Sequence, residues 1–200
     1  MLKQITIIIL LGCLLGCSKT SLLTEQTDSH PEISVDIRFP LEEYVIFNNF
    51  GVYSNEMGNE YHAAEDAIAS GGTPVYAIAD GIISFSGPML GYGYLIVIDH
   101  SDRDIYSLYG HLSTSREKMS DGAVKMGERI AYIGYDEEDG SGGIYPYWAP
   151  HLHFGIRKGQ RKDYDEQSDR RWMAGWTRAY PTNYRWIKPS DYIIEQLTTD

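Results

Sequence analysis

His151-Leu152-His153-Phe154-Gly155-Ile156 is the stretch of this 200-residue chain that decides its fold and its candidate site. In a β-strand, successive side chains point to opposite faces, so this pattern separates two sets of residues. Leu152, Phe154 and Ile156 would form an apolar face that anchors the strand in a core, while the other face carries two imidazoles. A rigid strand that aims nitrogen ligands into a groove is a suitable scaffold for a metal site. The alternative is a surface strand whose histidines face water.

Short apolar runs separated by Gly, Asn and Asp begin near residue 44 and continue to this stretch, which is typical of an all-β domain. Asp80-Gly81 lies between two of these runs and predicts a β-hairpin. Because no helical period is sustained across the runs, we expect a curved antiparallel sheet. The expected strands are 44–47, 75–78, 82–85, 94–98, 105–109, 130–133 and 152–156.

The composition indicates one globular domain with a leader and tails, since 42% of the residues are hydrophobic and 22% are charged. The formal charge is −11, with 17 Lys and Arg against 28 Asp and Glu. Binding to nucleic acid needs clustered Lys and Arg, so this balance argues against a nucleic-acid partner. An acidic surface favours solubility instead.

Residues 1–17 have the pattern of an export signal, with Lys3 followed by an apolar run too short to span a bilayer as a permanent helix. Leu14-Leu15-Gly16-Cys17 resembles the bacterial lipobox, in which the Cys becomes the lipidated first residue of the mature protein. Leu10-Leu11-Gly12-Cys13 fits nearly as well, but a longer apolar segment precedes Cys17 and polar residues follow it at once. The alternatives are an ordinary signal peptide cleaved elsewhere and a retained anchor.

Lipidation at Cys17 would hold the domain on a membrane. The next residue, Ser18, is not the Asp that resembles an inner-membrane retention signal, so we expect the outer membrane in a cell that has one. Both cysteines of the chain lie in the leader. The exported domain therefore has no disulfide available, and its stability must come from its core and any metal.

Three further segments follow the leader. Residues 18–40 are polar and broken by Pro31 and Pro40, which predicts a flexible tether before a domain at 41–157. Residues 158–200 form an aromatic-rich extension that we expect to pack on the domain, with sugar stacking or a groove wall as the alternative. The charged run from Arg157 to Arg171 is expected to be a solvated loop. The four tryptophans are Trp148, Trp172, Trp176 and Trp186.

His62 and Asp66 are candidate partners of the opening strand. They stand four positions apart, close enough to bind one ion from a loop that runs into a strand. A zinc site that does chemistry usually has three protein ligands and leaves one position for water. His62, Asp66 and one histidine of the pair 151 and 153 would satisfy that count. The alternative for His62 is a solvated loop histidine.

Several motifs in register resemble the lysostaphin-type (LytM-type) zinc metallopeptidases, which cut peptidoglycan peptides. The resemblance runs from about residue 50 to residue 156. The matching motifs are His62-x-x-x-Asp66, Gly72-Thr73-Pro74-Val75-Tyr76-Ala77, Ala79-Asp80-Gly81, Gly91-Tyr92-Gly93 before a strand that ends at His100, Tyr109-Gly110-His111-Leu112-Ser113, Gly127 to Gly134, and Pro150-His151-Leu152-His153-Phe154.

The resemblance implies a role for five side chains. The family's metal ligands fall on His62, Asp66 and His153, which implies a bound Zn²⁺. Its two unligated catalytic histidines fall on His111 and His151. The two remaining histidines of the chain, His30 and His100, receive no role.

The chain departs from the family pattern in two places. Ala64 stands where the family usually has Gly, which reduces backbone freedom but removes no ligand. The segment 135–148 is longer than the usual short turn and would border the groove, so it bears on substrate preference. Beyond Ile156 the match fades.

The resemblance implies a zinc metalloendopeptidase that hydrolyses peptide cross-links of peptidoglycan, and the lipobox-like leader predicts that it is membrane-anchored. A short tether gives only local reach, so the expected substrate is a stem-to-stem bond that starts at D-alanine in the cell's own wall, and not a polyglycine bridge. The main alternative is a LytM-type regulator that binds and activates a cell wall amidase without hydrolysing. A purely structural zinc site is disfavoured because such sites usually take four protein ligands.

Overall fold

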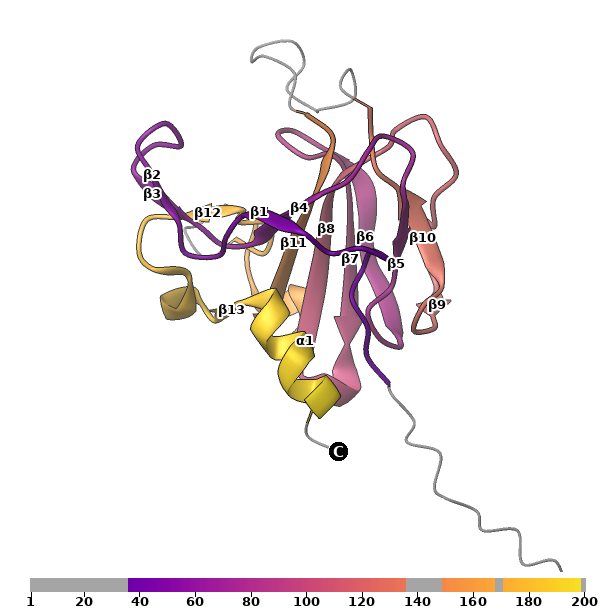
Figure 1. Ribbon diagram of the computed structural model, residues 1–200. Coiled ribbons are helices and arrows are strands. Elements are labelled where there is room, and N and C mark those ends of the chain that lie inside the picture. Colours follow the sequence, from indigo (N-terminus) through magenta and orange to yellow (C-terminus); the bar gives the residue numbers. More distant parts are fainter. Residues whose placement is uncertain (1–35, 136–148, 168–170, 199–200) are drawn as a thin grey trace, which may run out of the picture. The chain divides into compact units, whose positions relative to one another are not determined.

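An antiparallel sheet of eight strands forms the centre of the computed structural model, which describes residues 36–135, 149–167 and 171–198 (Figure 1). This confirms the predicted fold class. The strand order is β1-β4-β11-β8-β7-β6-β9, and β13 pairs with β11 outside this path. The strands are β1 (Ile46–Asn48), β4 (Glu65–Ile68), β6 (Gly81–Met89), β7 (Gly93–His100), β8 (Ile105–Leu112), β9 (Ala123–Val124), β11 (His151–Lys158) and β13 (Trp186–Ile187).

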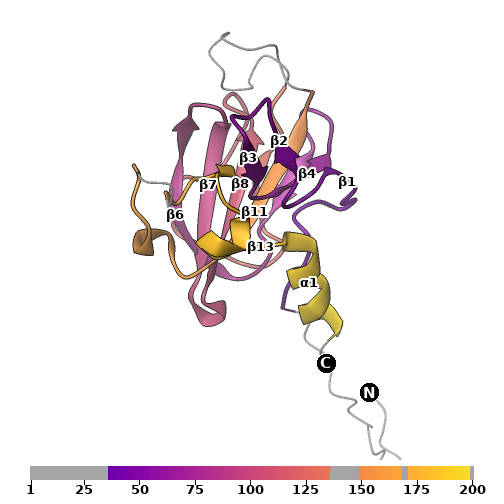
Figure 2. The same cartoon turned by 90° about the vertical axis from the view of Figure 1, so that its left-hand side faces the viewer.

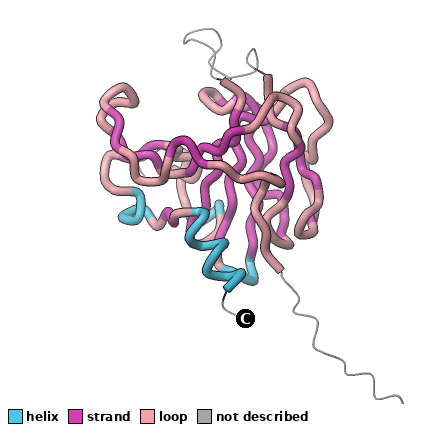
Figure 3. The backbone as a smooth tube through the Cα atoms, in the orientation of Figure 1, coloured by secondary structure: helices cyan, strands magenta, loops and turns pink. Residues whose placement is uncertain are grey.

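Two smaller sheets and short helices accompany the central sheet, and Figure 3 shows more strand than helix in the described chain. One sheet pairs β10 with β5, and the other has the order β12-β3-β2. Their strands are β2 (Tyr53–Ser54), β3 (Glu60–His62), β5 (Pro74–Tyr76), β10 (Arg129–Tyr132) and β12 (Trp176–Thr177); the helices are η1 (Ser101–Arg103), η3 (Arg161–Asp163), η4 (Pro181–Tyr184) and α1 (Pro189–Thr198).

The central strands are buried on both faces. Consecutive residues along them are apolar, and successive side chains point to opposite faces of the sheet. In β7, Leu95 and Val97 belong to one apolar cluster, while Ile96 and Ile98 belong to the other. Each fully buried side chain of this size contributes roughly 1.5–3 kcal/mol. The views in Figures 1 and 2 show β6, β7, β8 and β11 side by side, which is the rigid platform behind the candidate site.

β11 has the alternation that the sequence predicted. Leu152, Phe154 and Ile156 lie in the larger apolar cluster, so their face of the strand is fixed in the core. The strand pairs with β4 on one side and β8 on the other. On its second face Gly155 is required, because a Cβ there would lie 2.9 Å from Cζ3 of Trp186.

The predicted hairpin at Asp80-Gly81 is wrong. β5 pairs with β10, and β6 pairs with β7 and β9, so the two flanking runs belong to different sheets. A type I′ turn needs positive φ at both central residues, and neither Asp80 nor Gly81 has one. The Asp80 carboxylate instead accepts hydrogen bonds from the backbone N–H of Met126 at 2.8 Å and from Nζ of Lys125 at 2.7 Å.

The ordered domain begins before residue 41, so the expected tether is too long at its carboxyl end. Ile37 and Leu41 are buried in the larger apolar cluster. The N–H of Arg38 donates to the carbonyl of Ile78 at 2.9 Å, and the carbonyl of Pro40 accepts from the N–H of Tyr76. The sequence missed this because single apolar residues between polar ones carry no periodic signal.

The C-terminal extension is part of the domain. Trp172 and Trp186 are buried in the second apolar cluster, and β13 extends the central sheet. Arg157 is fully buried, which corrects the prediction of a solvated run starting there. Its guanidinium donates to the carbonyls of Tyr184 and Arg171 and stacks 3.6 Å from the ring of Tyr164.

Some predictions lie outside the described residues: the leader with Cys13 and Cys17, the tether up to residue 35 with His30, and the segment 136–148 with Trp148. Within the described ranges, no helix combines the length and the apolar character needed to cross a bilayer.

Candidate active site

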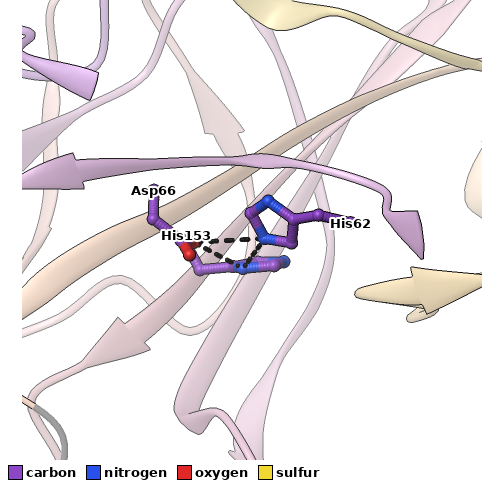
Figure 4. Close-up of side chains that lie close together, drawn as sticks. All are labelled: His62, Asp66 and His153. Carbon is purple, nitrogen blue, oxygen red and sulfur yellow. Dashed lines mark hydrogen bonds and ion pairs between the residues drawn. The ribbon is translucent and has the colours of Figure 1, made fainter. Parts of the chain in front are cut away.

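Three side chains from three strands converge at the site. His62 ends β3, Asp66 lies in β4, and His153 lies in β11 directly opposite Asp66 in the antiparallel register. His153 Nδ1 lies 2.9 Å from Asp66 Oδ1 and 3.3 Å from His62 Nε2, and His62 Nε2 lies 3.4 Å from Asp66 Oδ1. Figure 4 shows the three atoms pointing toward a common position. All three residues are buried, so the cluster is an internal feature of the fold.

This donor set fits a zinc ion. Ligand atoms about 2.0–2.1 Å from a tetrahedral zinc lie about 3.3–3.4 Å from each other, and two of the three separations have that size. Two imidazole nitrogens and one carboxylate oxygen are ligands that zinc commonly takes, and three protein ligands leave a position open. The described residues therefore support the metal ligands that the resemblance implied.

Neighbouring groups fix which atom of His62 and of Asp66 faces the centre. His62 Nδ1 donates to the backbone carbonyl of Asn49 at 3.2 Å, which leaves Nε2 as the lone-pair nitrogen. Asn48 Nδ2 donates to Asp66 Oδ2 at 2.8 Å, so Oδ1 faces the histidines. Asn48 was not predicted, because an Asn in a short strand carries no motif.

The cluster favours an ionised Asp66 carboxylate beside a neutral His153 ring. Burial opposes ionisation of Asp66, but hydrogen bonds with His153 and His62 hold the pKa of its carboxyl well below its usual range. Burial lowers the pKa of His153, while Asp66 works in the opposite direction. Neutral imidazoles and an anionic carboxylate are the protonation states that metal binding requires.

His111 and His151 lie beside this cluster, as the resemblance implied. Their ring centroids are 4.4 Å apart, and the ring of His111 lies 5.8 Å from that of His153. His151 Nδ1 donates to the carbonyl of Ala149 at 2.8 Å, so in the neutral ring Nε2 is the basic nitrogen. That nitrogen lies 3.8 Å from Asp66 Oδ1.

His111 has an unusual backbone conformation, with φ of 60° in the left-handed region. Residues other than Gly rarely adopt this region, and such strain is concentrated at functional sites. The conformation is held by hydrogen bonds from His111 N–H to the carbonyl of Tyr92 and from Gly134 N–H to the carbonyl of His111, both at 2.8 Å. Burial, aided by the charges of His151 and His153, lowers the pKa of His111 well below its usual range.

A cavity of about 400 Å³ is lined by His111 and His153. Trp176 of the extension lines it and places its ring 4.7 Å from the ring of His62. Trp176 therefore contributes to a groove wall, whereas Trp172 and Trp186 pack in the core. On another side of the site, the half-exposed ring of Phe47 lies edge-on to His151 at 5.3 Å.

The sheet thus presents a His-Asp-His cluster that could hold a metal ion, with two further histidines and an open cavity beside it. Residues 60–165, more than half of the chain, match the model of peptidase family M23, and the chain belongs to this family. The family is linked to peptidoglycan metabolism, and its peptidases depend on zinc.

Curated relatives align with part of this chain. A DD-carboxypeptidase/endopeptidase, Mpg of Neisseria meningitidis, is 38% identical over 96 residues, which cover 48% of this chain and 20% of that protein. The murein hydrolase activator NlpD of Escherichia coli is 40% identical over 100 residues, covering 48% of this chain and 24% of that protein. The alignments thus span about a quarter or less of these relatives.

Solved structures support the fold. Lysostaphin of Staphylococcus simulans superposes with a TM-score of 0.57 at 24% identity, over 84% of this chain and 57% of that chain. Its catalytic domain alone superposes with a TM-score of 0.54 at 24% identity, over 76% of this chain and 92% of that chain. This comparison places the central sheet in the lysostaphin-type architecture.

Proposed function

We propose that this protein is a membrane-anchored zinc metalloendopeptidase that hydrolyses peptide cross-links of peptidoglycan. The observation that carries the proposal is the convergence of His62 Nε2, Asp66 Oδ1 and His153 Nδ1 within 3.4 Å of each other, beside two further histidines. Membership of a peptidase family supports it, as does the similarity to a relative described as a DD-carboxypeptidase/endopeptidase.

His62, Asp66 and His153 would hold the zinc. When bound there, zinc would supply a Lewis acid and bring the pKa of a coordinated water to about 7. Attack on a peptide carbonyl builds negative charge on its oxygen and requires a proton for the leaving amine. His111 and His151 divide these two tasks, and the basic Nε2 of His151 lies on the side of Asp66.

The second candidate is a regulator that binds a cell wall amidase without hydrolysing. The similarity to proteins described as murein hydrolase activators favours it. A regulator has no need of a complete ligand set and two adjacent histidines, and the described residues hold both. We therefore favour the enzyme.

Parallel digestions test the proposal. Zinc-loaded protein is incubated with purified cross-linked muropeptide dimers, with pentaglycine peptides, and with a cell wall amidase and intact peptidoglycan. We expect conversion of dimers to monomers and no cutting of pentaglycine. Rapid cutting of pentaglycine with intact dimers would overturn the substrate, whereas stimulation of the amidase without any cutting would favour the regulator.

Anchoring through Cys17 is the part of the proposal that rests on sequence alone, through Leu14-Leu15-Gly16-Cys17 and the following Ser18. The expected location is the outer membrane, facing the periplasm. Mass spectrometry of the mature amino-terminal peptide is expected to find acyl chains on Cys17. Acyl chains on Cys13, or an unmodified Cys17, would contradict this.

A further inference from the structure

Arg171 is a cation in the cavity that the proposed chemistry does not use. It lines the same cavity as His111 and His153, and it is the one Lys or Arg among the described residues that do so. Within the described ranges, its guanidinium takes part in no hydrogen bond or ion pair. A half-buried guanidinium without such a partner is unusual in a chain of net charge −11, where Asp and Glu outnumber Lys and Arg.

The backbone at Arg171 is fixed, which sets the origin of this side chain. Nη1 of the buried Arg157 donates to the carbonyl of Arg171 at 3.0 Å. The next residue, Trp172, is 1% exposed, and its N–H donates to the carbonyl of Asp165 at 3.0 Å. The backbone at Arg171 is therefore held by contacts with the core of the domain.

The segment that begins at Arg171 runs directly over the candidate centre. The hydroxyl of Tyr92 donates to the carbonyl of Met173 at 2.7 Å. Gly175 lies so close to the ligand histidine that a Cβ there would be 3.2 Å from Nε2 of His153.

The rest of the cavity wall leaves Arg171 as the main partner for an anionic substrate group. Met57, Met89 and Met173 line the cavity with apolar side chains, and Glu60 is its one carboxylate among the described residues. Glu60 lies 4.0 Å from Arg178, an exposed residue outside the lining. An anionic substrate group entering this apolar space would find a strong partner in Arg171, because a guanidinium binds a carboxylate through two parallel charge-assisted hydrogen bonds.

We propose that Arg171 binds a substrate carboxylate on the carbon that bears the scissile nitrogen, and so selects peptides that have this group. Such a carboxylate is present when the leaving residue is the last of a peptide, and when a cross-link amine has a carboxylate on the same carbon. An internal bond of a polyglycine bridge lacks it. This inference deepens the proposed function and depends on it only for the position of the scissile bond.

Binding tests the inference separately from catalysis. The zinc-loaded His151→Ala protein, in which turnover is suppressed, is titrated with an acetylated peptide ending in D-Ala–D-Ala and with the same peptide as its C-terminal carboxamide. Hydrogen bonds to a charged group contribute about 1.5–3 kcal/mol, so we expect the carboxylate form to bind about 10- to 100-fold more tightly. Adding Arg171→Gln is expected to bring this ratio close to one, while Arg171→Lys should keep part of it.

Arg178→Gln is the matched control, because Arg178 is a nearby arginine that does not line the cavity, and it should keep the full ratio. Zinc content and circular dichroism confirm that each variant is folded and loaded.

An unchanged ratio in Arg171→Gln, a ratio near one with Arg171 present, or binding of neither peptide would overturn the inference. Hydrolysis by the protein with His151 intact is followed in parallel. If binding favours the carboxylate peptide in an Arg171-dependent way but no peptide is hydrolysed, the carboxylate site at Arg171 is supported and the proposed function is contradicted.

Discussion

A single side chain can decide which atom of a ligand is available to a metal. Asn48 is the clearest case, because its amide holds one oxygen of Asp66 and leaves the other toward the histidines. Groups that orient metal ligands in this way typically change metal affinity 10- to 100-fold when they are removed. The sequence indicated the ligands but not the residue that orients Asp66, because that depends on which residue of β1 lies opposite Asp66 in the sheet.

Asn48→Ala is expected to weaken zinc binding by about 10- to 100-fold while the fold is kept. The measurement is a competition titration against a zinc chelator. Asn49→Ala is the matched control, because Asn49 is exposed and contributes only its backbone carbonyl to His62. Equal zinc affinities of the two variants would show that the bond from Asn48 to Asp66 does not matter.

His111 and His151 should behave differently from the ligands. His111→Ala and His151→Ala are expected to retain zinc and to lose about 10²- to 10⁴-fold in turnover, because proton transfer and charge stabilisation contribute factors of that size. Metal analysis beside kinetics distinguishes them from His153→Ala, which should lose both zinc and activity. Zinc loss in His151→Ala, or nearly normal rates in both variants, would remove them from the catalytic roles.

At the scale of elements, a buried carboxylate joins the C-terminal helix to the strand of Asp66. Glu65 in β4 is fully buried and accepts hydrogen bonds from Ser190 Oγ at 2.6 Å, from Ser190 N–H at 3.0 Å and from the Tyr44 hydroxyl at 3.1 Å. The N–H of Ser190 is one of the first in α1, which the helix itself leaves without a partner. Glu65 therefore acts as a cap supplied by the sheet.

Glu65→Gln is expected to lower the free energy of unfolding by about 1–3 kcal/mol, because the new amide NH₂ would face donors where the carboxylate accepted. Urea denaturation of the metal-free protein measures this. The control is Asp191→Asn in the same helix, which breaks only the exposed pair with Lys188 and should cost less than about 1 kcal/mol. Similar losses for the two variants would contradict the role of Glu65 as a cap.

His100 connects the end of β7 to the core and gives the fold a defined dependence on pH. Its Nδ1 donates to the carbonyl of Asp80 at 2.8 Å, and its Nε2 lies 2.8 Å from the hydroxyl of Ser107. Burial lowers the pKa of His100 from 6.5 to about 4. The unfolded chain therefore binds a proton between pH 6.5 and pH 4 that the folded chain excludes, so stability falls as the pH falls through this window.

This difference in pKa corresponds to a loss of about 3 kcal/mol between pH 7.5 and pH 4. His100→Gln keeps a donor and an acceptor but does not titrate, so its stability should decrease by correspondingly less over the same range. Urea denaturation of both metal-free proteins at the two pH values measures the difference. Parallel curves for the two proteins would contradict the assignment to His100.

Strand alternation was predictable, whereas contacts between distant segments were not. The pattern of β11 predicted its apolar face correctly because a half-buried strand repeats every two residues. The turn signal at Asp80-Gly81 failed because the carboxylate of Asp80 binds the distant residues Lys125 and Met126. A signal for α1 was present in Pro189-Ser190-Asp191, since Pro is favoured at the first helical position.

At the scale of the whole molecule, the extension completes the site instead of covering one side of the domain. The motifs that carry the family resemblance end near Ile156, yet Trp176 and Arg171 line the cavity from the extension. The buried Arg157 holds the carbonyl of Arg171, whereas Trp176 is placed by the pairing of β12 with β3, in which it lies opposite His62. The resemblance therefore implied the metal ligands, whereas the positions of Arg171 and Trp176 in the cavity wall depend on contacts between distant segments that the sequence did not indicate.

The central claim is that the His62, Asp66 and His153 cluster is a catalytic zinc site. The most direct test is a titration of metal-free protein with zinc while the hydrolysis of cross-linked muropeptide dimers is followed. We expect the rate to rise with zinc and to saturate at one zinc per chain, and we expect no rise for His153→Ala. Uptake of one zinc per chain without hydrolysis, or hydrolysis that does not depend on zinc or on His153, would contradict the account.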